Sequence, residues 1–156
     1  MITSNGKGIY KIVDLSDTKT TNLASTSFEG ITIQPPEGFI YKVIMAGFYT
    51  GVPSGGASGT HYVLLHSSNS PSTTTFQYYK HTSNFGSALS VLASGYVDIA
   101  DSNQKPDDGP GQVNSFNNAY ATYDNPLYLH YKNLCDVQQD QNRIYTIKVL
   151  QITTGV

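Results

Sequence analysis

The chain has 156 residues, one cysteine and a formal net charge of -2, and only 13% of its residues are charged. This length suits one domain with one hydrophobic core, expected over residues 1–156. A lone cysteine excludes a small scaffold held together by internal disulfides. The weak charge excludes nucleic acid as the main partner, because a polyanion is attracted by a strong basic field.

The polar composition is unusual, with 14 Gly, 12 Tyr and no Trp. Such surfaces are typical of extracellular or particle-exposed proteins. Yet no signal-peptide pattern follows Met1, and no run of 18 apolar residues predicts a transmembrane segment. Two explanations stay open at this point. Either the protein folds in a cytoplasm and leaves it inside a larger assembly, or a signal peptide was removed and a start Met was added in cloning.

The first half of the chain predicts four strands, separated by clusters of turn residues. The first covers Gly8–Leu15. The second, Phe28–Ile33, ends before Pro35-Pro36, because proline supplies no N–H to a sheet. Gly38–Tyr49 is apolar at odd and even positions, which predicts a strand covered on both faces, by its own core on one side and by something else on the other. Thr60–His66 follows a glycine-rich loop.

The middle of the chain is harder to interpret. Thr73–His81 is predicted to be a strand beside Thr60–His66. Ser87–Ala93 fits one or two helical turns, although strand character returns at Gly95–Ile99. The long polar stretch Asp101–Asp124 is interpreted either as a binding or subunit-contact loop or as a solvated connection.

The last two strands have the clearest patterns. Pro126–Lys132 alternates like a half-buried strand, and Arg143–Ile152 like a more buried one. About eight strands with uneven connections predict an all-β fold, an antiparallel two-sheet sandwich of the eight-stranded jelly-roll type with Greek-key crossings. An immunoglobulin-like sandwich is the second choice, although the buried Trp and paired Cys of antibody domains are absent.

No catalytic constellation is found, so we predict that the protein is not an enzyme and has no cofactor. Its four histidines are too dispersed for a local metal signature, and Cys135 lies in no nucleophile motif. The best acidic cluster fits either a calcium loop or ordinary turn chemistry, and it does not match the EF-hand spacing. The histidines are His61, His66, His81 and His130, and the acidic residues are Asp98, Asp101, Asp107 and Asp108.

Aromatic residues are the remaining signal. Tyrosine offers a large amphipathic contact area at low entropic cost, so it favours protein interfaces and sugar-stacking platforms. The alternative is that these rings fill the core and the strand edges of the sandwich. The candidate interface residues are Phe39, Tyr41, Phe48, Tyr49, Tyr78, Tyr79, Tyr120 and Tyr123.

Three segments, Pro35–Val43, Asn125–Tyr131 and Arg143–Ile152, together resemble the single jelly-roll virion proteins of bacterial and archaeal viruses. The resemblance implies a capsid or capsid-decorating subunit that self-assembles through sheet edges and loops. Its partners would be copies of itself and other virion proteins, in a virion assembled in the host cytoplasm. Residues Met1–Lys7 would form a flexible N-terminal arm.

Two other classes of protein stay open. A carbohydrate-binding module or lectin also uses β-sandwiches with exposed aromatic residues, and a glycan receptor would then be the partner. The absence of Trp, the strongest sugar-stacking residue, counts against it. A small β-sandwich enzyme would have to draw on the dispersed histidines.

Overall fold

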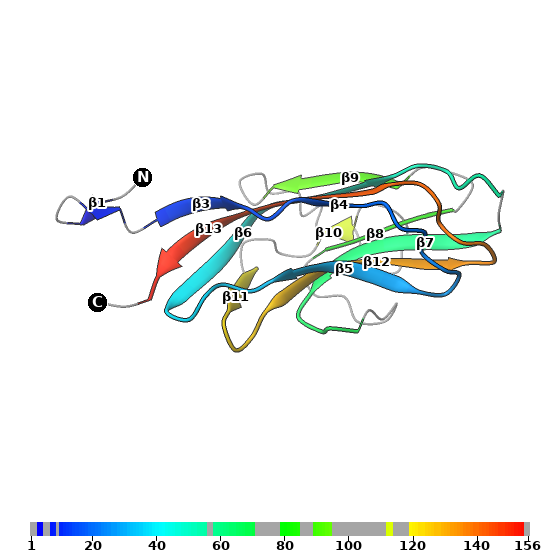
Figure 1. The fold of residues 1–156 in the computed structure, drawn as a ribbon. Coiled ribbons are helices and arrows are strands. Elements are labelled where there is room, and N and C mark those ends of the chain that lie inside the picture. Colours follow the sequence, from blue (N-terminus) through cyan, green and yellow to red (C-terminus); the bar gives the residue numbers. More distant parts are fainter. Residues whose placement is uncertain are drawn as a thin grey trace.

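The computed structural model describes residues 3–4, 7–8, 10–55, 58–70, 79–84, 89–94, 112–113 and 119–154. Side chains are described for 10–55, 58–70, 89 and 119–154. Every regular element in these ranges is a strand (Figure 1). The strands are β1 (Thr3–Ser4), β2 (Lys7–Gly8), β3 (Tyr10–Asp14), β4 (Asp17–Lys19), β5 (Phe28–Ile33), β6 (Phe39–Thr50), β7 (Gly59–His66), β8 (Tyr79–Asn84), β9 (Leu89–Ser94), β10 (Gln112–Val113), β11 (Tyr120–Thr122), β12 (Leu127–Cys135) and β13 (Arg143–Thr153).

Two antiparallel sheets face each other (Figure 1). The first, called the β13 sheet, has the order β11-β6-β13-β3, with β9 also paired to β6 and β4 also paired to β13. The second, called the β12 sheet, has the order β10-β8-β7-β12-β5. The short strands β1 and β2 pair only with each other among the described strands.

The strand order confirms the predicted jelly roll. Eight main strands remain in the described ranges if the short strands β1, β2, β10 and β11 are left out and β3 and β4 count as one interrupted strand. Along these eight, the chain changes sheet at every step except from β7 to β8. Such repeated crossing is typical of two interlocked Greek keys. It differs from the immunoglobulin-like alternative, in which consecutive strands more often share a sheet.

A β-bulge in β6 explains why this strand is apolar at odd and even positions. Val43 pairs with Val149 and Met45 with Lys148, so Ile44 has no partner in β13. The extra residue reverses which positions face inward: Tyr41 before the bulge and Phe48 after it both join the core. In the single chain the outward Tyr49 of β6 is exposed, so the second cover expected for this strand would have to come from outside the described residues. The strand buried on both faces is β7, where every side chain from His61 to His66 is buried.

Inward-facing side chains of both sheets form the core. Phe48 of β6 stacks on Tyr131 of β12, with ring centroids 4.9 Å apart, and meets Tyr145 of β13 edge-on at 5.0 Å. These contacts join the two sheets directly, and offset or edge-on aromatic pairs stabilise a core beyond their buried area.

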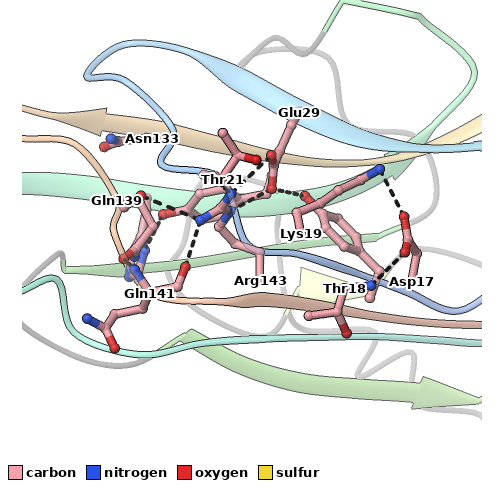
Figure 2. Close-up of polar contacts among 12 residues, drawn as sticks. Asp17, Thr18, Lys19, Thr21, Glu29, Asn133, Gln139, Gln141 and Arg143 are labelled. Carbon is pink, nitrogen blue, oxygen red and sulfur yellow. Dashed lines mark hydrogen bonds and ion pairs between the residues drawn. The ribbon is translucent and has the colours of Figure 1, made fainter.

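A buried polar network closes one end of the sandwich (Figure 2). The Arg143 side chain has no exposed surface, and its Nε lies 2.6 Å from Oε1 of Glu29 on the opposite sheet. The Tyr145 hydroxyl donates to the same carboxylate oxygen at 3.1 Å. The guanidinium also donates to the carbonyls of Thr21 and Gln141. Further contacts to Oε2 of Glu29 at 3.3 Å and to the Gln139 carbonyl at 3.5 Å give all five N–H groups of the guanidinium an acceptor, as a buried charge requires.

Several sequence-based boundaries can be compared with the strands. Phe28–Ile33 coincides with β5, and β12 and β13 begin within one residue of their predicted starts. The prediction of helical turns at Ser87–Ala93 was wrong, because Leu89–Ser94 forms the strand β9, held by its pairing with β6. The expected strand at 95–99, the acidic cluster and most of the polar stretch 101–124 lie outside the described residues.

Candidate interaction surface

The outer face of the β13 sheet carries rows of apolar side chains. Residues directly opposite each other in antiparallel strands share a face, so the strand register defines each row. One row across β3, β13, β6 and β11 consists of Ile12, Leu150, Lys42 and Tyr120. The next row consists of Tyr10, Ile152, Ile40 and Thr122. These rows give one continuous strip across four strands.

A further pair of apolar side chains lies along the same face, beyond the two rows. Tyr49 of β6 is directly opposite Ile144 of β13, and Met45 lies on the same face between this pair and the strip. We call the combined surface the apolar face. Its members are Tyr10, Ile12, Ile40, Met45, Tyr49, Tyr120, Ile144, Leu150 and Ile152.

The most exposed members of the apolar face are large. Ile12 is 61% exposed, Tyr49 47%, Tyr120 44% and Ile144 41%. Single exposed apolar residues are ordinary on a protein surface, whereas a contiguous apolar patch marks an interaction site. β13 and β6 have 11 and 12 residues, whereas β3 and β11 have only 5 and 3. One face of these four strands therefore covers roughly 490 Å², at about 3.3 Å per residue and about 4.8 Å per strand. A standard protein interface uses about 800 Å² of each partner.

Few charges interrupt the apolar face. The Lys42 ammonium lies over the Tyr120 ring, 5.7 Å from its centroid, so part of its charge is offset by the aromatic face. Lys148 is directly opposite Asp14. Hydrogen bonds from Ser16 lower the pKa of Asp14, and Lys148 adds a smaller electrostatic contribution. The lysine charges are thus partly matched within the surface, which favours an apolar partner over a polyanion.

The structure divides the predicted interface residues into groups. Tyr49 and Tyr120 lie on the apolar face. Tyr41 and Phe48 are 6% and 2% exposed, and their place in the core prevents direct contact with another chain. Tyr79 lies in β8, where its side chain is not described, and Tyr78 is outside the described residues.

The remaining two candidates, Phe39 and Tyr123, line a shallow hollow beside the apolar face. The hollow has a volume of about 290 Å³. The backbone carbonyl of Tyr123 accepts a hydrogen bond from Nε2 of Gln34 at 2.6 Å, which holds the Tyr123 side of the hollow in position. The other lining residues are Glu37, Gly38, Ile40, Thr122, Asp124 and Thr154.

Sequence reasoning missed Ile12 and Ile144. Both lie in strands that were predicted, but their exposure depends on which face of the sheet is covered. The alternation in β13 places Tyr145, Ile147 and Val149 in the core and Ile144 outside it. The alternation in β13 can be seen in the sequence and would have indicated that Ile144 faces outward. The direct pairing of Ile144 with Tyr49 is visible only in the structure.

The described part of the chain holds no group of three or more metal-ligating side chains. His66 and His130 are buried and adjacent, with His66 Nε2 2.7 Å from His130 Nδ1. Burial lowers the pKa of His66 to about 4, and burial together with a smaller contribution from the neighbouring His66 lowers the pKa of His130 to about 4. His61 is also buried, and its Nδ1 lies 3.0 Å from the Tyr131 hydroxyl.

Within the described ranges, no helix is long and apolar enough to cross a membrane. The fold and the surface together define an eight-stranded jelly-roll domain with an exposed apolar sheet face.

No family model and no curated protein matches this sequence. Among solved structures, the chain is similar to one titled as a cryo-EM structure of Mud crab tombus-like virus, with a TM-score of 0.46 and 13% identity. The match covers 100% of this chain and 87% of that chain. A TM-score below 0.5 at this identity carries no inference about function, and it does not single out viruses of bacteria or archaea.

Proposed function

We propose that this protein is a virion structural subunit, a capsid or capsid-decorating protein that assembles with copies of itself. The apolar face is the observation that carries the proposal. It spans four strands and exposes large side chains such as Ile12 and Tyr49 in one contiguous patch. A soluble chain with such a face gains free energy by covering it, and a second copy is always present at the same concentration.

The jelly-roll fold supports this role in a general way, because two-sheet jelly rolls serve as building blocks of capsids and also of lectins. The fold alone does not choose between these roles. Assembly in the host cytoplasm, contact with other virion proteins and an N-terminal arm over Met1–Lys7 belong to the same proposal.

Light scattering over a range of protein concentrations tests self-assembly. We expect a discrete oligomer or particle for the natural chain and a shift towards the 17.0 kDa monomer for the double variant Y49S/I144S. Both side chains are exposed, so the substitutions leave the core intact. Val52→Ser is the matched control, because Val52 is 46% exposed but lies in a loop outside the apolar face.

Two results would contradict the proposal. The natural chain could remain a 17.0 kDa monomer at high concentration. Alternatively, Y49S/I144S could assemble as well as Val52→Ser does, which would leave assembly possible but place it away from the apolar face.

The hollow beside β11 favours a second candidate function, carbohydrate binding. Tyr123 and Phe39 offer aromatic surfaces, and the Glu37 and Asp124 carboxylates lie at the same hollow and accept hydrogen bonds from hydroxyl groups. A glycan array distinguishes the two roles. Saturable binding that is lost in Tyr123→Ala would support a lectin-like protein. If no glycan binds, the structural role would remain as the single candidate function.

A further inference from the structure

The outer face of the β12 sheet contains a pair of buried histidines in direct contact. His66 is the last residue of β7 and His130 lies in β12. Their side chains are 1% and 6% exposed, and the two ring nitrogens are 2.7 Å apart. No hydrogen-bond partner in the described residues reaches Nδ1 of His66.

Aromatic rings and backbone surround this pair. The Tyr128 ring stacks on His130 with centroids 5.3 Å apart, and the Phe28 ring meets His130 edge-on at 5.3 Å. Gly30 of β5 lies directly beside the ring, since a Cβ there would be 2.5 Å from Cδ2 of His130. Within the described residues, the groups in contact with the His130 imidazole cannot balance a positive charge as a carboxylate would.

The charged and titratable groups on this face provide no such balance. On β12 they are Tyr128 and Lys132, whose ammonium lies 5.7 Å from the Phe28 ring centroid. On β7 there is Tyr62, and the backbone register pairs Leu64 with Lys80 of β8. β5 contributes Phe28, Gly30 and Thr32. No Asp or Glu occupies this face in the described parts of the four strands.

The contact requires at least one neutral ring. One nitrogen donates its proton and the other accepts it through a lone pair, so the bond exists when the pair is neutral or singly protonated. If both rings are protonated, all four nitrogens become donors, the bond is lost and two like charges face each other in a buried site. Exposing the rings to water relieves both costs.

We propose that the His66–His130 pair is an acid-sensitive contact, and that its protonation loosens the packing between the end of β7 and β12 while the core side of the sheet stays packed. The inference does not depend on the assembly role proposed above. Leu65 and Leu129 anchor the core side of the same two strands and carry no titratable group.

The direction of the pH effect follows from linkage. An unfolded or opened state binds protons with the ordinary pKa of about 6.5, whereas the folded pKa values are near 4. Above pH 6.5 both states hold neutral histidines and the folded state keeps its full stability. As the pH falls from 6.5 towards 4, the opened state takes up protons first, so stability is lost across that window.

The experiment compares the natural chain with H66Q/H130Q. Glutamine retains a donor and an acceptor but does not titrate. Between pH 7.5 and 5 we expect the folding equilibrium constant of the natural chain to fall about tenfold or more beyond the change in the variant. Hydrogen exchange, corrected for its intrinsic pH dependence, should accelerate in β7 and β12 more than in β6 and β13.

Imidazole nitrogen NMR of the natural chain tests the same proposal without any variant. We expect His66 and His130 to stay largely neutral at pH 5.5 in the folded protein. Titration of both rings near pH 6.5 would overturn the proposal. Equal acceleration of exchange in both sheets would also overturn it, because the effect would then be global rather than local.

Discussion

Arg143 on β13 and Glu29 on β5 form an ion pair across the sandwich, with Nε 2.6 Å from Oε1. The arginine side chain is fully buried, and the carboxylate is 19% exposed. Because the two residues belong to different sheets, this pair fixes the distance between the sheets at one end of the core.

Replacing Glu29 with alanine should strongly destabilise the fold. The substitution leaves a buried guanidinium without its counter-charge, which typically costs about 3–5 kcal/mol in the free energy of unfolding. Urea unfolding at pH 7 measures the loss. Asp17→Ala is the control, because the Asp17–Lys19 ion pair lies on the surface and should contribute nothing measurable. A loss for Glu29→Ala as small as the control's would contradict this account.

Gly30 should not tolerate even one extra carbon. A Cβ at this position would lie 2.4 Å from the Leu129 carbonyl oxygen, a backbone atom held by strand pairing. Gly30→Ala should lower the unfolding free energy by about 1–3 kcal/mol, as other overpacked sites do. In the control Gly55→Ala, the new carbon would meet Val137 at an ordinary 3.8 Å. Similar midpoints of urea unfolding for the two variants would be inconsistent with the close approach at Gly30.

Cys135 should be chemically inert in the folded protein. It is 2% exposed, and its thiol donates to the Thr60 carbonyl at 2.9 Å. Burial, with a smaller contribution from Asp136, raises the pKa of the thiol to about 12, so the reactive thiolate is scarce at pH 8. An aromatic disulfide reagent should modify this single thiol only as the protein unfolds. Rapid modification of the native protein would show that the site opens readily.

Much of the fold could be predicted because strand formation leaves a local pattern. The alternation in Pro126–Lys132 and the proline pair after Ile33 identify the strands β12 and β5 from neighbouring residues alone. The β9 segment lacked such a signal. Its residues suit helix and strand about equally, and pairing of Leu89 with Thr50 and Val91 with Phe48 selects the strand.

The interaction surface was less predictable, because exposure depends on the whole sandwich. Tyr41 and Tyr49 look alike in the sequence, yet one is buried and the other is 47% exposed. The bulge between them decides the difference, and no local pattern marks it. Ile12 and Tyr120 are far apart in the sequence and lie in the same row, separated by Leu150 and Lys42, only through strand pairing.

The unpaired Ile44 also protects the sandwich against misalignment. A one-residue slip of an ordinary strand would turn all its side chains to the other face. A strand with apolar residues at both odd and even positions, such as β6, would by its side chains alone resist that slip only weakly. In β6 the slip would have to carry the bulge along the strand, past β13 on one side and past β9 or β11 on the other. The bulge therefore fixes the register of β6 relative to its neighbouring strands. Every copy of the protein would then present the outward-facing rows of side chains in the same arrangement.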